Sequence, residues 1–305
     1  MNTARDSFPV AIVGTGNMGG GMALNLLSRG WPVRVHDIDR AKVDALAARG
    51  AQACADAAEA ASQATLTIVC VIDTPQCEQV LFGPRGVVSS AGAQHTVMLC
   101  PTISPQDVES FARRLAERGI ATIDAPMSGG PQRAAEGTMS LMVACPAGLY
   151  DTHRALIETL SSQVFRISER PGDGARTKLV NNLLAGINLV GAAEAMALAQ
   201  RLGLDPAVSL DVIERSSGQS WIGSDRMRRA LAGDFAPRAH VTLLEKDTGL
   251  AVAAARAAGF EGPLGAAAHD TFARTHAMGH AALDDAAVYL ALGGTPLPPH
   301  GDGSR

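Results

Sequence analysis

Short apolar runs alternate with longer segments of mixed apolar and polar character through the first half of the chain. Short runs rich in β-branched residues are typical of buried strands, whereas apolar positions three and four apart are typical of helices. Helices are predicted between the early strands, at residues 16–28 and 40–49. Such alternation indicates βαβ units, and therefore an α/β fold with a doubly wound, mostly parallel sheet. Strands are predicted at residues 10–13, 33–36, 66–71, 96–99, 120–124, 140–144 and 164–167.

The strand pattern stops after residue 167, and helical patterns follow. Residues 172–203 read as one long helix that ends at a glycine, as helices commonly do. We therefore expect an α/β domain over residues 1–171 and an all-helical domain over 172–292, joined by the long helix. The last residues, 293–305, are rich in glycine and proline and are expected to be disordered. Further helices are predicted at residues 206–216, 224–232, 242–258, 263–278 and 284–292.

A glycine-rich segment follows the first predicted strand directly. Between a strand and a helix, its glycines permit a tight turn and a close approach of the backbone to a pyrophosphate. Asp37 follows the second strand, where a carboxylate accepts hydrogen bonds from ribose hydroxyls and repels a 2'-phosphate. The pattern predicts a Rossmann-type domain that binds NAD rather than NADP, although Arg40 offers an alternative contact for a phosphate. The segment consists of Gly14, Thr15, Gly16, Asn17, Met18 and Gly19.

A second turn of small residues, Ser128, Gly129 and Gly130, follows the strand predicted at 120–124. A hydroxyl and exposed backbone N–H groups can hold a carboxylate without an arginine. An ordinary strand-to-helix turn explains the same residues equally well.

Lys178, Asn181 and Asn182 lie on the first turns of the long predicted helix. Residues three and four apart share a helix face, so the amine and the two carboxamides can converge on one small volume. This combination suits proton transfer to a bound oxygen. The alternatives are a solvated lysine and asparagines that cap the helix.

Composition narrows the class of protein further. The chain has 305 residues, 47% of them hydrophobic and 18% charged, and a formal net charge of −4. Its basic residues are scattered, so neither a nucleic acid nor a membrane surface is expected as a partner. No stretch reads as long and apolar enough to span a bilayer, and the first apolar run is too short for a signal peptide, so a cytoplasmic protein is expected.

The cysteines and histidines predict no disulfide and no metal site. Cys54, Cys70, Cys77, Cys100 and Cys145 form no CxxC pair and are expected to be reduced. His276 and His280 are spaced one helical turn apart, but no third ligand accompanies them in the sequence.

Four motifs in this order resemble the β-hydroxyacid dehydrogenase family, which includes 3-hydroxyisobutyrate dehydrogenase and tartronate semialdehyde reductase. The resemblance covers essentially the whole chain. Residues 216–227 are most similar to the members that oxidise L-threonate. The motifs are residues 14–19 with 22–26, residues 124–138, residues 172–182, and Lys246 with Asp247.

The resemblance implies a role for each matching residue. Lys178 would be the catalytic acid/base, Asn181 and Asn182 would orient the substrate, and the turn at 128–130 would bind its carboxylate. Lys246 and Thr102 would lie near the cofactor. The chain departs from the usual family pattern at Met127 and Thr15, and neither change removes a functional group. Val71 and Ile72 would lie in the loop under the nicotinamide.

The expected function is therefore NAD-dependent oxidation of a small hydroxy acid by a homodimer or homotetramer, with L-threonate oxidised at C2 as the leading substrate. Gln219 and Ser220 offer hydrogen bonds for such a polyol acid, and Trp221 packs in the core, packs at a contact between domains or forms a wall for the substrate. Oxidation of 3-hydroxyisobutyrate and reduction of tartronate semialdehyde are the alternatives within the enzyme class. A dinucleotide-binding sensor without turnover is the alternative outside it.

Overall fold

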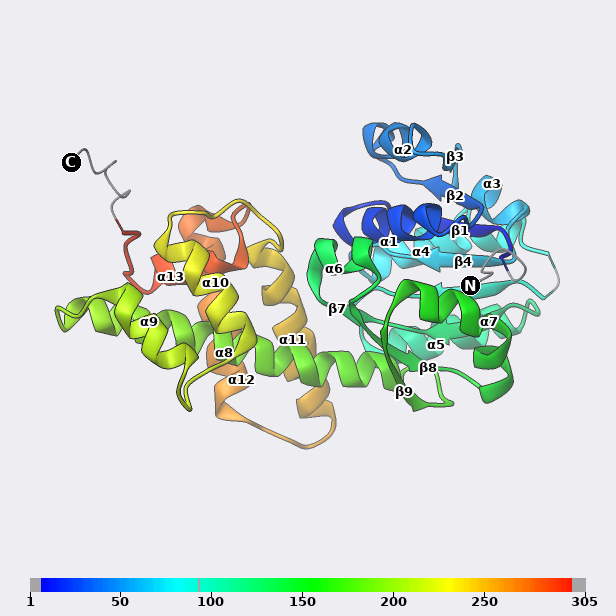
Figure 1. The fold of residues 1–305 in the computed structure, drawn as a ribbon. Helices are drawn as coiled ribbons and strands as arrows, with labels where there is room; N and C mark the ends of the chain where they lie inside the picture. The colour runs from blue at the N-terminus through cyan, green and yellow to red at the C-terminus, as the bar shows by residue number, and fades with distance from the viewer. Residues whose placement is uncertain (1–6, 93, 298–305) are drawn as a thin grey trace. The chain divides into compact units, whose positions relative to one another are not determined.

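The computed structural model describes residues 7–92 and 94–297 (Figure 1). The chain divides into two compact units, Met1–Lys178 and Leu179–Arg305. This division lies inside the long helix, whereas the predicted boundary lies just before it.

A single sheet forms the centre of the first unit. Across the described residues it has nine strands in the order β3-β2-β1-β4-β5-β6-β8-β7, with β9 also paired to β8. Neighbouring strands from β3 to β6 are parallel, β8 is antiparallel to β6 and β7, and β9 is parallel to β8. The strands are β1 (Val10–Val13), β2 (Val33–His36), β3 (Gln52–Ala53), β4 (Leu66–Val69), β5 (Thr96–Leu99), β6 (Ala121–Asp124), β7 (Met127–Ser128), β8 (Ser140–Ala144) and β9 (Gln163–Ser168).

The predicted α/β fold with a mostly parallel sheet is confirmed, and each of the seven predicted strands is present. Two strands of two residues, β3 and β7, were not predicted, because so short a run carries no readable alternation. Alternate residues of β1 pack on opposite faces of the sheet. Val10 and Ile12 belong to one apolar cluster, and Ala11 and Val13 belong to another. Helices therefore cover both faces, as expected for a doubly wound sheet.

The helices of the first unit connect these strands. A 3-10 turn at Val87–Ser89 precedes β5. The helices are α1 (Asn17–Ser28), α2 (Arg40–Ala47), α3 (Ala57–Ser62), α4 (Thr74–Phe82), α5 (Pro105–Ala116), α6 (Gly130–Glu136) and α7 (Ala147–Leu160).

The second unit is helical around its own core, in which Leu189, Met227, Phe272 and Tyr289 are completely buried. The helix predicted from residue 224 begins earlier, because Ser220 accepts a hydrogen bond from the N–H of Gly223 (3.1 Å) and caps the first turn. The elements are α8 (Asp173–Arg201), α9 (Pro206–Glu214), α10 (Trp221–Leu231), α11 (Val241–Ala257), α12 (Pro263–Thr275), a π-helical turn (His276–His280), a 3-10 turn (Asp285–Ala287) and α13 (Val288–Ala291).

By length and composition, α8 could cross a membrane, so the prediction that no stretch passes this test is wrong for this helix. Its most apolar 18-residue window has a mean hydropathy of 1.4 and is 39% buried. The core helix of a soluble protein passes the same test, so the observation is weak evidence for a membrane span.

The predicted disorder does not extend over residues 293–297. The carbonyl of Thr295 accepts hydrogen bonds from Gln200 Nε2 (2.7 Å) and from the Tyr289 hydroxyl (3.1 Å). The N–H of Leu297 donates to the carbonyl of Leu231 (2.8 Å). The rest of the predicted tail, residues 298–305, lies outside the described residues.

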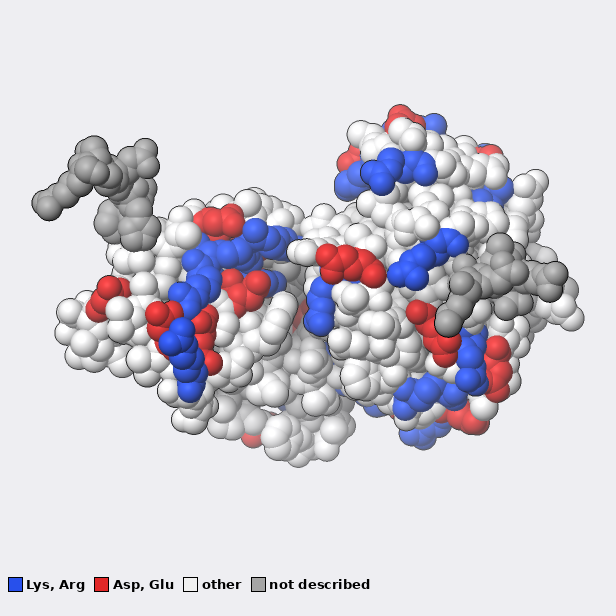
Figure 2. Space-filling view, in the orientation of Figure 1, with Lys and Arg blue, Asp and Glu red and all other residues white. Residues whose placement is uncertain are grey.

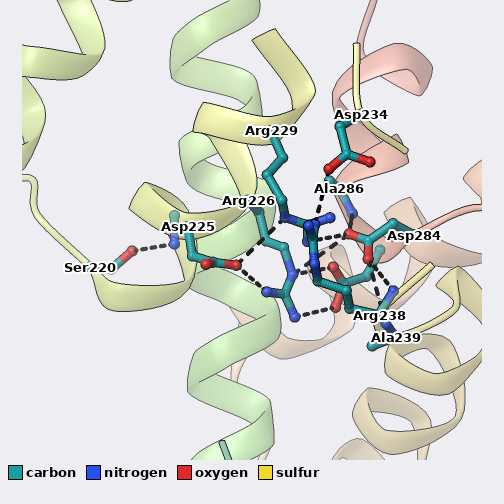
Figure 3. Close-up of polar contacts among 11 residues, drawn as sticks. Ser220, Asp225, Arg226, Arg229, Asp234, Arg238, Ala239, Asp284 and Ala286 are labelled. Atoms are coloured by element: carbon teal, nitrogen blue, oxygen red, sulfur yellow. Dashed lines mark hydrogen bonds and ion pairs between the residues drawn. The ribbon is translucent and has the colours of Figure 1, made fainter. Parts of the chain in front are cut away.

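A buried ion network ties α10 to the segment that precedes α13 (Figure 3). Arg226 Nε donates to Asp285 Oδ1 (2.5 Å), and Arg229 Nη2 donates to Asp284 Oδ1 (2.8 Å). Both aspartates are about fully buried, at 0% and 1% exposed for Asp284 and Asp285. Burial opposes ionisation of Asp284, but the hydrogen bond from Arg229 and backbone N–H groups lower its pKa. The network therefore matches buried charges with partners on another element.

Removing one partner of this network should destabilise the second unit. Arg226→Ala leaves Asp285 buried without its guanidinium, and we expect a loss of about 3–5 kcal/mol in the free energy of unfolding. Urea unfolding followed by far-ultraviolet circular dichroism measures it. Arg228→Ala is the matched control on the same helix, because Arg228 pairs with Asp211 and Glu214 at the surface, and its loss should be much smaller. Equal losses for the two variants would contradict the assignment.

Candidate functional site

The residues predicted to bind the cofactor, apart from Lys246 on α11, follow neighbouring parallel strands. Strands β2, β1, β4, β5 and β6 are adjacent and parallel, so their carboxyl ends meet at one edge of the sheet. The chain order reverses between β1 and β4, which is where such sheets bind their ligands. Asp37, Gly14, Val71 and Thr102 each follow one of these strands.

Two glycines allow the turn after β1 to pack closely. Gly14 has a φ of +91°, and a Cβ there would lie 2.4 Å from the carbonyl oxygen of Cys70. A Cβ at Gly19 would lie 1.9 Å from the carbonyl oxygen of Gly14. Any side chain at these two positions would push α1 away from β1 and β4. Their part in the glycine motif is therefore to bring strand and helix together.

Gly16 differs from the other two glycines, because a Cβ there would meet nothing within 4 Å. Asn17 and Met18 follow it as the first residues of α1, and no side chain caps this helix end in the described structure. The first turn also carries no acidic residue. Open space over a helix amino end without a carboxylate suits a pyrophosphate, so these residues fit a dinucleotide.

The Asp37 carboxylate is held in place at the end of β2. Its Oδ2 accepts hydrogen bonds from the N–H of Thr15 (2.6 Å) and from the Thr15 hydroxyl (3.3 Å). Its Oδ1 accepts one from the N–H of Asp39 (2.8 Å). Thr15, which departs from the family pattern, thus links the glycine turn to the predicted ribose ligand. The alternative phosphate contact, Arg40, instead pairs with Asp44 (2.9 Å) at the surface.

Three further predicted residues lie in loops at the same edge. Val71 lies against the glycine turn, with its Cγ1 3.1 Å from the position of a Cβ at Gly14. Ile72 is 59% exposed, and its N–H donates to Gln76 Oε1 (3.1 Å). Thr102 is partly buried after β5. This placement is compatible with contacts to a cofactor, and the contacts themselves stay a prediction.

The Ser-Gly-Gly turn joins β7 to α6. Ser128 pairs with Ser140 of β8, while Gly129 and Gly130 have φ angles of +135° and +79° that other residues rarely adopt. Helix α6 packs tightly on α1, since a Cβ at Gly21 would lie 2.9 Å from the Cβ of Ala134. The turn is thereby brought next to the helix that follows the glycine motif. The binding of the substrate carboxylate by this turn stays a prediction.

Lys178 and Asn182 lie one turn apart on α8 and are each 7% exposed, whereas Asn181 is exposed. The start of this helix is held at β6, because Asp124 Oδ2 accepts hydrogen bonds from the N–H groups of Gly172 (2.7 Å) and Ala175 (3.1 Å). The buried lysine contradicts the alternative of a solvated side chain.

Asp247, which the sequence analysis gave no role, connects the other predicted residues of the helical unit. Asn181 Nδ2 donates to Asn182 Oδ1 (3.0 Å), and Asn182 Nδ2 donates to Asp247 Oδ2 (2.7 Å). Lys246 Nζ pairs with Asp247 Oδ1 (2.8 Å). The carboxylate is 3% exposed and fixes the orientation of the Asn182 carboxamide. The sequence signal for this role was an aspartate directly after Lys246, within one of the family motifs.

Residues 216–227, which resemble the L-threonate-oxidising members, include side chains with structural roles. Ser220 caps α10, and Arg226 belongs to the buried ion network. Trp221 is 59% exposed, so it does not pack in the core. His276 Nδ1 lies 2.7 Å from Glu245 Oε2 at the surface. Among residues 7–92 and 94–297, no three potential ligands gather at a metal site.

Comparison with known proteins decides the family. Residues 9–168 match the NAD binding domain of 6-phosphogluconate dehydrogenase, and residues 172–292 match the family described as "NAD-binding of NADP-dependent 3-hydroxyisobutyrate dehydrogenase". L-Threonate dehydrogenases of Cupriavidus necator and Escherichia coli are 37% and 35% identical, covering 95% of this chain and 97% of each relative. The chain belongs to the 3-hydroxyisobutyrate dehydrogenase-related family of β-hydroxyacid dehydrogenases.

Solved structures agree with this placement of the dehydrogenase. A 3-hydroxyisobutyrate dehydrogenase of Salmonella typhimurium is 35% identical, with a TM-score of 0.88 over 93% of this chain and 100% of that one. This β-hydroxyacid dehydrogenase is therefore an NAD-dependent oxidoreductase that acts on CH–OH groups, as the motifs predicted. A binding protein without turnover finds no support in these relatives, which are named dehydrogenases.

Gly16 provides a test of the dinucleotide site that leaves the fold intact. Gly16→Ala should lower NAD affinity about tenfold or more, because the added methyl group occupies the open space over the amino end of α1. The melting temperature should stay unchanged. Calorimetric titration with NAD and a thermal melt measure the two effects.

Gly148→Ala is the matched control, since a Cβ there also meets nothing within 4 Å and the position lies on α7. This variant should bind NAD as the wild type does. Unchanged NAD affinity in a folded Gly16→Ala protein would show that the space over Gly16 holds no part of the cofactor.

Proposed function

We propose that the chain catalyses the NAD-dependent oxidation of a small hydroxy acid, with L-threonate oxidised at C2 to the 2-oxo acid and Lys178 as the general acid/base. The similarity to L-threonate dehydrogenases over 95% of the chain supports the substrate. The family resemblance of residues 172–182 supports the lysine.

The observation that carries the proposal is a buried lysine in a chain that otherwise prefers arginine. Of the 26 basic residues, 23 are arginines, and the lysines are Lys42, Lys178 and Lys246. A guanidinium keeps its proton under all ordinary conditions, whereas an amine can release one and take it back. Lys178 is 7% exposed and lies beside the carboxamide-bearing turn of α8. A lysine rather than an arginine at this buried position fits a need for proton transfer.

The chemistry requires a base at the substrate oxygen. Hydride leaves the carbon only as the attached hydroxyl loses its proton, so Lys178 would accept that proton in the oxidative direction. In the reverse direction its ammonium would donate the proton and stabilise the developing oxyanion. NAD, when bound, supplies the hydride acceptor. The C–H electron pair thus moves to the cofactor, and the hydroxyl proton moves to the amine.

The remaining residues would bind and orient. Ser128, Gly129 and Gly130 would hold the substrate carboxylate through a hydroxyl and backbone N–H groups. Asn181 and Asn182 would orient the substrate hydroxyls, with Asp247 keeping the second carboxamide in one orientation. Lys246 and Thr102 would contact the cofactor.

The position of Asp37 favours NAD over NADP. Its carboxylate is fixed by three hydrogen bonds from Thr15 and Asp39 at the end of β2, where a 2'-phosphate would be repelled. A relative solved in complex with NADP+ is 28% identical with a TM-score of 0.86, so both cofactors are to be compared in the assay.

The protein would act in the cytoplasm as a homodimer or homotetramer. The exposed apolar surface of the helical unit fits such an oligomer. Helices α8 and α9 expose several large apolar side chains, and a monomeric soluble protein rarely leaves a large apolar surface in contact with water. On the face shown in Figure 2, acidic side chains lie beside the basic ones, including along the band of basic side chains on the second unit, so the basic residues there have acidic neighbours. The apolar residues are Val180, Leu184, Leu198, Val208 and Val212, together with Leu202 just after α8.

Lys178→Ala should remove turnover while leaving NAD affinity within about twofold of the wild type. Loss of a general acid/base lowers kcat by about 10²–10⁴-fold. Steady-state oxidation and NAD titration measure the two quantities. Lys42→Ala is the matched control, because Lys42 lies exposed on α2 beside Asp39, and it should behave as the wild type. A folded Lys178→Ala enzyme within tenfold of wild-type turnover would exclude the lysine as the base.

A substrate panel tests the finer assignment. We expect kcat/KM with NAD to be at least about tenfold higher for L-threonate than for 3-hydroxyisobutyrate or glycerate, because a site built to bind several hydroxyls leaves buried polar groups unpaired with a poorer partner. A preference for 3-hydroxyisobutyrate would reject L-threonate and keep the reaction class.

A further inference from the structure

The buried carboxyl group of Asp124 lies at the point where the sheet of the first unit meets the amino end of α8. Asp124 is 1% exposed at the end of β6. Its Oδ2 accepts hydrogen bonds from the N–H groups of Gly172 (2.7 Å) and Ala175 (3.1 Å), and the N–H of Gly174 also faces it. One side chain thereby engages three backbone donors that precede the second turn of the helix.

The glycines of this segment make the contact possible. A Cβ at Gly174 would lie 2.9 Å from the Asp124 carboxyl carbon and 2.9 Å from the Met142 carbonyl oxygen. Gly172 has a φ of +101°, which turns its N–H toward the same carboxyl group. The Gly-Asp-Gly-Ala sequence that opens the helix is therefore shaped around Asp124.

The ionised form of Asp124 suits its donors. Unpaired N–H groups and the helix dipole both favour negative charge at a helix amino end. Burial nevertheless raises the pKa of the Asp124 carboxyl to about 6. Three backbone N–H groups lower this pKa and the Asp173 carboxylate raises it, so burial is the larger effect. Asp124 thus changes charge close to the range in which enzymes work.

Two thiols also face Asp124 from neighbouring strands. Cys100 follows β5, and Cys145 follows β8. Burial raises the pKa of Cys145 to about 11 and raises that of Cys100 well above its ordinary value. Both thiols stay protonated near neutral pH, so a change of charge between pH 5 and 7 comes from the carboxyl group.

We propose that Asp124 is a positioning residue whose ionised carboxylate holds the first turn of α8 on the sheet and so fixes Lys178, three residues beyond Ala175. The role assigned to Lys178 rests on the proposed function. When the carboxylate is protonated, its N–H donors lose a charged acceptor, and the turn loosens. Misplacement of a catalytic group by about 1 Å costs on the order of a hundredfold in rate.

The reductive reaction distinguishes the effect of protonating Asp124 from the effect of protonating Lys178. In that direction the ammonium form of Lys178 is the active one, so acid does not remove its proton. With a pKa of about 6, the ionised fraction of Asp124 falls about tenfold from pH 7 to pH 5. The rate of reduction of the 2-oxo acid formed from L-threonate should fall by the same factor in the wild type.

Asp124→Asn should lower kcat about tenfold to a hundredfold at pH 7, leave the KM for NADH within about twofold, and abolish the decline toward pH 5. Asp205→Asn is the matched control, because Asp205 caps α9 by accepting from the N–H groups of Ala207 and Val208. It should keep both the rate and the acid decline. A decline that persists unchanged in Asp124→Asn overturns the proposal.

Hydrogen exchange of the peptide covering residues 170–182 tests the same contact without turnover. After correction for intrinsic exchange, wild-type protection of the first turn of α8 should fall about tenfold from pH 7 to pH 5, and Asp124→Asn should show the lower value at both. Wild-type protection independent of pH overturns the proposal even if the variant does not fold. If the wild type reduces no 2-oxo acid, the proposed function fails, and the exchange result still decides whether Asp124 holds the helix.

Discussion

The carboxyl ends of neighbouring parallel strands meet at one edge of a sheet, and the site in the first unit depends on this constraint. Strands β2, β1, β4, β5 and β6 are adjacent, so the residues that follow them come together although they span most of the unit. Gly14 and Gly19 let α1 start within contact of Cys70, the residue after β4. Asp37 is then joined to the same turn by Thr15. The geometry of the candidate dinucleotide site thus depends on strand order and on two positions where a Cβ cannot fit.

Helix α8 connects the same edge of the sheet to the residue proposed for proton transfer. Its first turn hydrogen-bonds to Asp124 at the end of β6, and Lys178 follows three residues after Ala175. Further along the same helix, Asn182 donates to Asp247, which also pairs with Lys246. Two buried carboxylates therefore hold this helix and its side chains, since Asp124 binds backbone N–H groups of its first turn and Asp247 binds the Asn182 carboxamide. Buried acids cost free energy unless they are paired, and here each is paired with donors that need a fixed position.

Local patterns predicted the helices and strands well and indicated a dinucleotide as cofactor, because each of these patterns depends on short spacings. The alternation of apolar residues located the seven longer strands, and Gly14 to Gly19 together with Asp37 indicated a dinucleotide. Contacts between distant positions were not predictable in this way. Asp124 and Gly172 are 48 residues apart, Asn182 and Asp247 are 65 apart, and Arg226 and Asp285 are 59 apart. The sequence does not reveal which donors folding will bring to a given carboxylate. For the same reason, residues 216–227 were interpreted as a substrate feature, although Arg226 within them belongs to the buried ion network.

In the proposed reaction, Lys178 exchanges a proton with the substrate oxygen as hydride transfers. The most direct measurement is the pH dependence of the hydride-transfer rate in single-turnover oxidation of L-threonate, compared between the wild type and Lys178→Met, with C2-deuterated substrate to confirm that hydride transfer is observed. We expect a rate that rises with pH in the wild type and a slow, pH-independent rate in the variant. A flat wild-type profile with a full isotope effect, or the same rise in Lys178→Met, would contradict it.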